Sequence, residues 1–155
     1  MISLNDLISP QAVIASLKAN SKKQALIELS EKAGELSGLD SREVLDALIQ
    51  RERLGSTAIG GGIAIPHGKL ARCERIFGVF ARLEKPIDFE ALDDAPVDLI
   101  FLLIAPETAG ADHLNALSRA ARVLRDQSLV ATLRSTRDPS ALYSILMRSP
   151  TPNAA

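Results

Sequence analysis

The sequence has few of the residues on which several classes of protein depend. Its 155 residues include one cysteine, two histidines and no tryptophan. A single cysteine cannot form an internal disulfide, which argues against a secreted disulfide scaffold. The longest uninterrupted apolar run, residues 99–105, is far shorter than the about 18 residues that cross a bilayer. We therefore predict no transmembrane helix and no direct membrane insertion.

An excess of charge of one sign is also lacking. The 18 Lys and Arg nearly balance the 19 Asp and Glu, so the net charge of −1 provides no general attraction to nucleic acid. Arg119, Arg122 and Arg125 recur at helical spacing, but Asp126 follows them and aromatic residues are absent nearby. We interpret them as a solvated helix face and expect no nucleic-acid partner. The N-terminus lacks a basic segment followed by an apolar stretch, which predicts a cytoplasmic location without a secretory signal.

The chain does contain the material for one hydrophobic core. Apolar residues make up 46% and charged residues 24%, close to the averages for soluble globular proteins. The length fits one domain, which we place at residues 1–148. The segment 149–155, SPTPNAA, is predicted to be a flexible C-terminal tail.

Capping residues and apolar spacing predict several helices. Ser21 can cap a helix with apolar residues at helical spacing, and Gly38 can end it in the left-handed region. Similar signals predict further helices over residues 40–54, from near residue 112, over residues 128–133 and from residue 139, where Pro follows a capping Asp.

Apolar segments between these helices predict a sheet. Residues 76–81 and 97–105 read as strands, and residues 12–15 indicate a further edge strand. The segment 97–105 is apolar on both faces, as in a central strand covered by helices on both sides. A local turn combined with long crossovers indicates a mixed parallel and antiparallel sheet. The predicted fold class is α/β: a small mixed sheet with helices packed on both faces, an α/β/α sandwich.

Both histidines lie beside features that suit an anion. His67 follows a loop containing Gly60, Gly61 and Gly62, and His113 lies in the first turn of a predicted helix. Glycines let backbone N–H groups approach a ligand, and a helix N-terminus carries partial positive charge. The loop matches neither GxxxxGK[ST] nor GxGxxG, so neither of these nucleotide-binding motifs is present. We interpret a neutral imidazole as the phosphate acceptor, since imidazole nitrogen forms covalent intermediates.

Cys73 suggests two alternatives to this chemistry. It lies six residues after His67, which could indicate a Cys and His nucleophile or a zinc site. Two histidines and one cysteine supply only three ligands, and they have no recognised zinc-site spacing. We therefore expect no metal and no cofactor, and we interpret Cys73 as a small, buried or half-buried thiol.

One stretch of the sequence resembles a known family. Residues 51–68, RERLGSTAIGGGIAIPHG, resemble the signature of the mannitol and fructose type of enzyme IIA domain in the bacterial phosphoenolpyruvate-dependent phosphotransferase system. Further similarity runs through residues 85–89, 96–99 and 112–114, so the resemblance covers about residues 5 to 147. It is greatest to the nitrogen-regulatory branch of that family. Ala58, where many relatives have Gly, departs from the pattern and affects only the expected loop geometry.

The resemblance implies a role for each candidate residue. His67 would be phosphorylated on Nε2 by an HPr-like phosphocarrier protein, His113 would donate a hydrogen bond to the phosphoryl oxygens, and Arg51 would add charge. Amides of the glycine loop, residues 60–62, would complete the site. Each role also has a structural alternative. His67 could be a hydrogen-bonded histidine at a strand end, and His113 a polar residue in the first turn of a helix. Arg51 could be a solvated arginine, and residues 60–62 a structural glycine turn.

The resemblance also leaves the biological role open. A nitrogen-branch protein regulates target proteins according to its phosphorylation state, whereas a sugar-transport protein passes the phosphoryl group to a IIB domain. The absence of a IIB segment before residue 155 favours the regulator. A non-catalytic interaction module with an unphosphorylated histidine is the third alternative.

Overall fold

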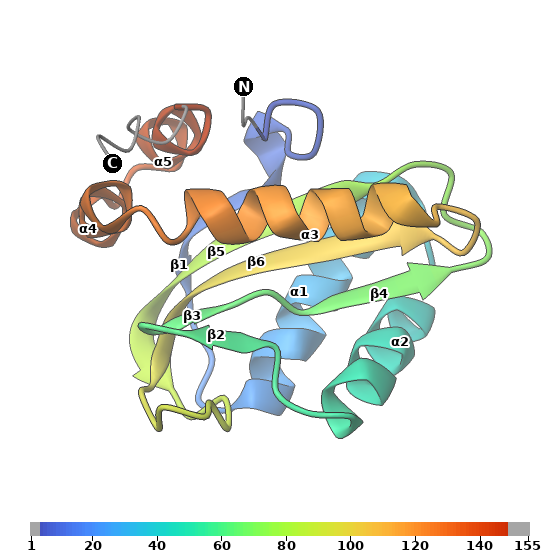
Figure 1. The fold of residues 1–155 in the computed structure, drawn as a ribbon, viewed down its shortest axis with the longest axis horizontal. Helices are drawn as coiled ribbons and strands as arrows, with labels where there is room; N and C mark the ends of the chain where they lie inside the picture. Colours follow the sequence, from blue (N-terminus) through green and yellow to red (C-terminus); the bar gives the residue numbers. More distant parts are fainter. Residues whose placement is uncertain (1–3, 149–155) are drawn as a thin grey trace.

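A computed structural model describes residues 4–148 of the chain, and the predicted tail at 149–155 lies outside the described residues. The helices are α1 (Lys22–Ser37), α2 (Ser41–Arg53), α3 (Ala111–Val123), α4 (Gln127–Ser135) and α5 (Pro139–Leu146), and a short 3₁₀ helix, η1, spans Pro10–Ala12 (Figure 1). The strands are β1 (Val13–Leu17), β2 (Ala58–Gly60), β3 (Ile63–Ala64), β4 (His67–Leu70), β5 (Phe77–Ile87) and β6 (Val97–Pro106).

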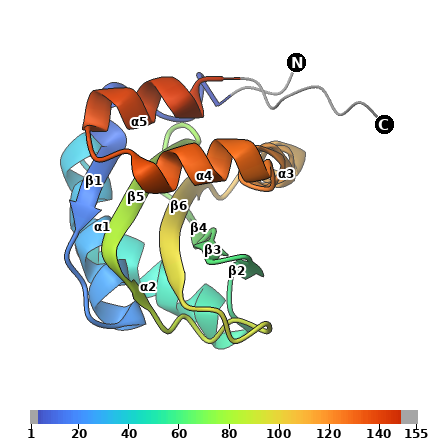
Figure 2. The same cartoon turned by 90° about the vertical axis from the view of Figure 1, so that its left-hand side faces the viewer.

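Within the described residues, these strands form one six-stranded sheet in the order β1-β5-β6-β3-β2, and β4 also pairs with β6. β1 is parallel to β5, β5 is antiparallel to β6, and β3 and β4 are both parallel to β6. Helices α1 and α2 lie on one face of the sheet, and α3 and α4 lie on the other (Figure 2). The predicted α/β fold, a mixed sheet with helices on both faces, is confirmed.

The centre of the core is β6. Every residue from Leu99 to Ala105 is fully buried, as expected for an apolar strand covered on both faces. The neighbouring strand leaves room for a large ring at one position. A Cβ atom on Gly78 would lie 2.7 Å from Cε1 of Phe101, so glycine allows this phenylalanine to pack directly on the β5 backbone.

The predicted helix ends follow their capping chemistry in most cases. The Ser21 hydroxyl accepts a hydrogen bond from the Gln24 amide, and Gly38 ends α1 in the left-handed region at φ 78°. The Asp138 carboxylate accepts from the Ala141 amide at the start of α5. Each side chain satisfies an N–H group that the first turn of its helix leaves unpaired.

Three parts of the prediction differ from the structure. Helix α4 begins at Gln127 because the Asp126 carboxylate, not Ser128, accepts from the first free amides. The segment interpreted as a loop before His67 contains the short strands β2 and β3, and β5 continues to Ile87, beyond the predicted end at residue 81. Pairing with neighbouring strands, which a short sequence window does not report, orders these segments.

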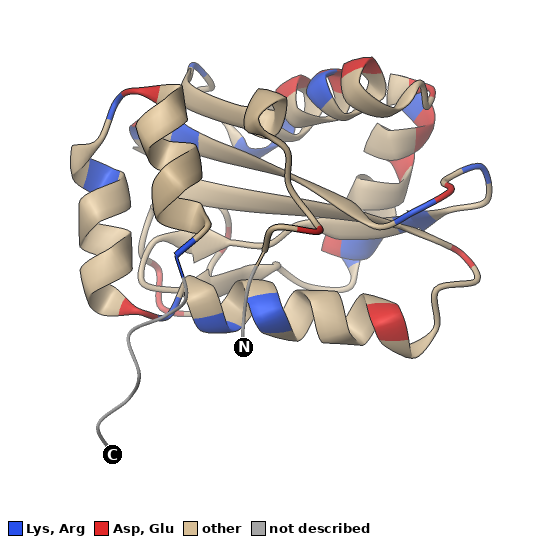
Figure 3. Ribbon diagram, turned by 90° about the horizontal axis from the view of Figure 1, so that it is seen from above, with Lys and Arg blue, Asp and Glu red and all other residues tan. Residues whose placement is uncertain are grey.

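The described surface has mixed charge. Figure 3 shows that basic and acidic residues are interspersed on the helices visible from that side. Among residues 4–148, the structure contains no helix that is both long enough and apolar enough to cross a membrane.

Candidate functional site

Three of the predicted site residues meet where β4 begins. His67 is the first residue of β4, Arg51 lies in the last turn of α2, and His113 lies in the first turn of α3. The Arg51 Nε atom is 3.2 Å from His67 Nε2. The rings of His67 and His113 meet edge to face, with 5.5 Å between their centroids and 61° between their planes. Three elements from separate parts of the sequence thus converge on one imidazole.

The position of His67 is set by the pairing of β4 and by its contact with α2. His67 lies opposite Leu103 of the buried strand β6, and the Leu103 amide donates to the Pro66 carbonyl at 2.9 Å. The next residue allows the helix to approach. A Cβ atom on Gly68 would lie 3.1 Å from the Cβ of Ala47, so the absence of a side chain lets α2 approach β4 closely enough to bring Arg51 to the histidine.

The hydrogen bonds of His67 define which ring nitrogen is a donor. Its Nδ1 atom lies 2.9 Å from the carbonyl oxygen of Ile65. A carbonyl only accepts hydrogen bonds, so Nδ1 carries the hydrogen and Nε2 of the neutral ring carries the lone pair. Arg51 donates to this lone pair. Nε2 is consequently the nitrogen that can form a bond to an electrophile.

The surroundings of both histidines favour the neutral ring. Burial lowers the pKa of His67 most, the hydrogen bond to Ile65 opposes this shift, and the charge of Arg51 adds to it. Burial also lowers the pKa of His113, assisted by His67 and Lys69. Because the ordinary pKa of histidine is about 6.5, both rings are neutral at pH 7.

His113 is buried with one unsatisfied nitrogen. The residue is only 6% exposed, and its Nε2 atom has no hydrogen-bond partner among the described residues. Gly110, the N-cap of α3, offers no side chain to cap the helix. A buried polar atom without a partner is unusual in folded proteins. The site therefore has unused hydrogen-bonding capacity beside His67.

The glycine loop does not join this site. Gly60 is the last residue of β2, and residues 61–62 form the turn that joins β2 to β3. The Gly61 amide donates to the Asp93 carboxylate at 3.0 Å, and Arg134 bridges the Asp98 carboxylate and the Gly61 carbonyl. The Gly62 carbonyl accepts from the amides of residues 98 and 99, whereas His67 lies opposite residue 103, about 13 Å further along β6.

This placement corrects the expectation that amides of Gly60, Gly61 and Gly62 complete the site around His67. All three residues have positive φ, between 67° and 95°. Glycine is favoured there because the turn requires left-handed backbone. The structural alternative, a glycine turn, accounts for this loop.

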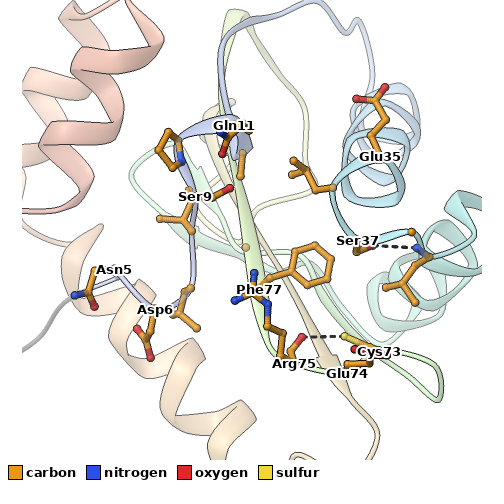
Figure 4. A pocket seen from close by; sticks show the side chains of 18 of the residues that line it. Asn5, Asp6, Ser9, Gln11, Glu35, Ser37, Cys73, Glu74, Arg75 and Phe77 are labelled. Carbon is orange, nitrogen blue, oxygen red and sulfur yellow. Dashed lines mark hydrogen bonds between the residues drawn. The ribbon is translucent and has the colours of Figure 1, made fainter.

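Cys73 lies at a separate cavity of about 1140 Å³ (Figure 4). The cavity is bounded by the segment before β1, the junction of α1 and α2, and the segment after β4, and none of His67, His113 and Arg51 lines it. The Cys73 thiol donates to the Arg75 carbonyl at 3.0 Å, and burial raises its pKa. Among residues 4–148, no group of three or more His, Cys, Asp and Glu side chains is arranged to hold a metal ion. Cys73 is therefore a protonated, buried thiol.

One charged residue close to the site was not singled out from the sequence. Glu52 follows Arg51, and its side chain is only 6% exposed. Its carboxylate forms an ion pair with Lys22 at 2.9 Å and accepts hydrogen bonds from both the amide and the hydroxyl of Thr57. In the sequence, Glu52 stands between two arginines in a polar helix end, which gives no sign of burial.

Comparison with known proteins provides independent support for the family. The family described as phosphoenolpyruvate-dependent sugar phosphotransferase system, EIIA 2, matches residues 6–149. A nitrogen regulatory protein of Bradyrhizobium diazoefficiens is 59% identical over 147 residues, which cover 95% of this chain and 96% of that protein. A fructose-specific EIIA component of Haloferax volcanii is 33% identical over 141 residues, 90% of this chain and 92% of that protein.

A solved structure agrees with the fold as well as with the sequence. The crystal structure of the nitrogen regulatory protein IIA-Ntr from Neisseria meningitidis superposes with a TM-score of 0.87 at 33% identity, covering 92% of this chain and 98% of that chain. The match of the family over nearly the whole chain, together with these relatives, shows that the protein belongs to the EIIA 2 family of the phosphoenolpyruvate-dependent sugar phosphotransferase system.

Proposed function

We propose that this EIIA protein is a phosphocarrier of the nitrogen-regulatory type, which accepts a phosphoryl group on Nε2 of His67 from an HPr-like carrier protein. One observation supports this most directly. The Ile65 carbonyl holds Nδ1 of His67 as a donor, so the lone pair is on Nε2, the nitrogen that faces Arg51. A neutral imidazole with its lone pair on a defined nitrogen is a competent nucleophile at pH 7.

The proposed transfer step moves the phosphoryl group from one imidazole ring to another. The Nε2 lone pair of His67 forms a bond to phosphorus while the bond from phosphorus to the donor nitrogen breaks, and the bonding pair leaves with the donor ring. The ring of the donor phosphohistidine carries a proton on its other nitrogen, so that ring leaves as neutral imidazole. On His67, Nδ1 keeps its hydrogen and its bond to Ile65. Since the bonds formed and broken are of one kind, the protein mainly has to position the rings and stabilise charge.

Two neighbours are suited to hold the phosphoryl oxygens. Nε2 of His113 has no partner among the described residues and can donate to an oxygen when it carries the ring hydrogen. Arg51 is anchored through Nη1 to the Gly55 carbonyl at 2.9 Å, which leaves the rest of its guanidinium at the reacting nitrogen. A guanidinium is well matched to phosphoryl oxygens.

Regulation would follow from the charge of the phosphoryl group. Phosphorylation adds roughly −1.5 to −2 charge at the acceptor. A target protein that covers His67 with apolar or acidic surface would be repelled, and one that offers arginine would be attracted. The relatives named nitrogen regulatory proteins support this role. The single cysteine and the expected carrier partner are consistent with a cytoplasmic protein.

A sugar-transport role is the second candidate, because one relative is a fructose-specific EIIA component. In that role the phosphoryl group would continue from His67 to a IIB domain and then to a sugar. Adding a purified fructose-type IIB domain to the phosphorylated protein distinguishes the two roles. Rapid and complete loss of the phosphoryl group to IIB supports transport, whereas retention supports regulation.

The phosphocarrier proposal itself is tested by mass spectrometry after incubation with phosphoenolpyruvate, enzyme I and the HPr-like carrier. We expect one added phosphoryl group, labile in acid and stable in base, in the wild type and none in His67→Ala. The histidine lies at the start of a strand and is partly exposed, so its removal should leave the fold intact. A wild-type protein that takes up no phosphate would favour the non-catalytic interaction module.

A further inference from the structure

We infer that Glu52 is a positioning residue for the phosphoryl transfer, because its buried carboxylate fixes, through Thr57, both hydrogen bonds of the His67 imidazole. This inference deepens the proposed function and rests on it. Glu52 makes no hydrogen bond to His67 in the described structure, although its charge raises the pKa of that histidine. Its positioning role runs through two chains of contacts that end on the two ring nitrogens.

The first chain of contacts reaches Nε2. Glu52 binds the amide of Thr57 at 3.1 Å and also the Thr57 hydroxyl, which closes the segment after α2 into a compact turn. Gly55 lies inside that turn, and its amide donates to the Glu52 carbonyl at 3.1 Å. The Gly55 carbonyl in turn anchors Arg51, whose Nε donates to His67 Nε2. The shape of the turn consequently sets the direction of the guanidinium.

The second chain reaches Nδ1. The carbonyl of Thr57 accepts a hydrogen bond from the Ile65 amide at 3.0 Å. The carbonyl of the same Ile65 accepts from Nδ1 of His67 at 2.9 Å. A shift of Thr57 would therefore move the acceptor that holds His67 in the reactive tautomer.

The Glu52 carboxylate is also held by an ion pair. Lys22 of α1 forms an ion pair with Glu52 at 2.9 Å, and its ammonium lies 4.9 Å from the centre of the Phe89 ring. Both charged side chains are largely buried, with 15% of Lys22 and 6% of Glu52 exposed. A buried ion pair is a weak source of stability, so a role in fixing geometry is the better explanation for its presence.

A second carboxylate provides a matched control. Glu90 also pairs with Lys22, at 3.1 Å, but its side chain is 73% exposed and, among the described residues, makes no hydrogen bond or ion pair with the turn after α2. Truncating Glu90 removes one partner of Lys22 without loosening Thr57. A difference between the two variants is therefore not explained by the charge of Lys22 alone, and Glu52→Gln, which removes the charge but keeps a hydrogen-bond acceptor, separates the charge of Glu52 from its positioning role.

The test compares Glu52→Ala, Glu52→Gln and Glu90→Ala, with Thr57→Val and Thr57→Ser as a second pair. Each protein is assayed for the rate of phosphoryl transfer from the carrier. Separately, the tautomer and pKa of His67 are measured by nitrogen NMR on the unphosphorylated protein. Thr57→Val replaces the hydroxyl by a methyl group and keeps the backbone contact to Glu52, so it remains informative if Glu52→Ala does not fold.

We expect Glu52→Ala to slow transfer about tenfold or more and to populate the other His67 tautomer, because small displacements of reacting groups have large effects on rate. Glu52→Gln should recover part of the rate, since its amide oxygen can still accept from Thr57. Thr57→Val should slow transfer about threefold. Thr57→Ser, which keeps the hydroxyl, should recover most of the rate that Thr57→Val loses, and Glu90→Ala should match the wild type.

Wild-type rates together with an unchanged His67 tautomer in folded Glu52→Ala and Thr57→Val would overturn the inference. A change in the pKa of His67 alone would not support it, because the charge of Glu52 raises that pKa directly. Failure of the proposed function gives a different result, because the wild type itself would then accept no phosphoryl group. The NMR measurement on His67 decides the role of Glu52 in that case as well.

Discussion

The Nε–H group of Arg51 donates to Nε2 of His67 at 3.2 Å, so the arginine occupies the lone pair that would attack phosphorus. In the resting protein this contact holds the ring and shields its lone pair. In the proposed phosphoryl transfer, Arg51 would have to release this nitrogen. Its Nη1 bond to Gly55 keeps the guanidinium close, which allows it to turn from the nitrogen to the phosphoryl oxygens over a short path.

Replacing this arginine should change both the pKa of His67 and its reactivity. Arg51→Gln removes a cation that lowers the pKa of His67, so we expect that pKa to rise. Loss of a charged hydrogen-bond donor should slow phosphoryl acceptance by about thirtyfold, equivalent to about 2 kcal/mol of transition-state free energy. An NMR titration and a transfer assay measure the two effects. Arg53→Gln, an exposed neighbour on the same helix, is the control, and equal behaviour of the two variants would contradict a role for Arg51.

His113 should matter more for the phosphorylated form than for acceptance. We expect His113→Ala to take up phosphate on His67 but to lose it by hydrolysis or to transfer it onward abnormally, because a donor to the phosphoryl oxygens is missing. Phosphorus NMR follows the decay after the donor is removed. Asn115→Ala, at an exposed position of the same helix, should behave as the wild type. Unchanged acceptance, transfer and decay in His113→Ala would show that the buried histidine is a bystander.

The two neutral histidines predict how stability depends on pH. Burial lowers the pKa of His67 and of His113 in the folded state, whereas in the unfolded chain both titrate near the ordinary value of about 6.5. Below that value the unfolded state binds more protons, so the free energy of unfolding should fall as the pH drops from 7 to 5. Urea denaturation at pH 7, 6 and 5 measures this.

The control for that pH dependence is the double variant His67→Gln, His113→Gln, which should show a shallower decline over the same range. Asp6 and Asp93 also have lowered pKa values, but their ordinary values lie near 4, so they act below this window. An identical slope in the double variant would mean that other groups account for the effect.

The glycine turn should affect stability without affecting the site. In Gly62→Ala the new Cβ atom would lie 2.6 Å from Nη2 of Arg134, at a backbone φ of 83° that side chains rarely adopt. We expect a loss of about 1 to 3 kcal/mol in the free energy of unfolding, and a smaller loss in Gly61→Ala, where the space is open. Phosphoryl transfer to His67 should be unchanged in the folded protein. A slowed transfer would restore the glycine loop as part of the site.

The thiol should be dispensable for the chemistry. We expect Cys73→Ser to accept phosphate at the wild-type rate and a chelator to have no effect on transfer, because a protonated thiol at a separate cavity is neither nucleophile nor ligand. Serine can keep the hydrogen bond to the Arg75 carbonyl. Loss of transfer in this variant, or inhibition by the chelator, would revive a thiol or zinc mechanism.

Much of the fold could be predicted because its signals are local. The capping of α1 by Ser21 and of α5 by Asp138, and the apolar β6, depend on residues adjacent in sequence. The short strands β2, β3 and β4 could not be predicted in the same way. Each is ordered by pairing with another strand, and three of the four residues from His67 to Leu70 are only partly buried or exposed.

The residues of the candidate site could be inferred from the sequence only in part. His67, His113 and Arg51 could be named from the motif and its resemblance, and the structure brings them together. Glu52 was missed because its burial depends on Lys22 and Thr57, which reach it only after folding. The glycine loop was misplaced because closeness to His67 in sequence does not imply closeness in space when a strand runs between them.

The parallel pairing of β4 with β6 also bears on when a newly made chain becomes active. His67 and Arg51 leave the ribosome early, but β6 and His113 are translated later, and without them His67 has neither its strand partner nor its ring contact. A nascent or misfolded chain would therefore present an ordinary solvated imidazole. Under the proposed function, phosphoryl acceptance at His67 would therefore depend on the folded chain, with β6 and His113 in place.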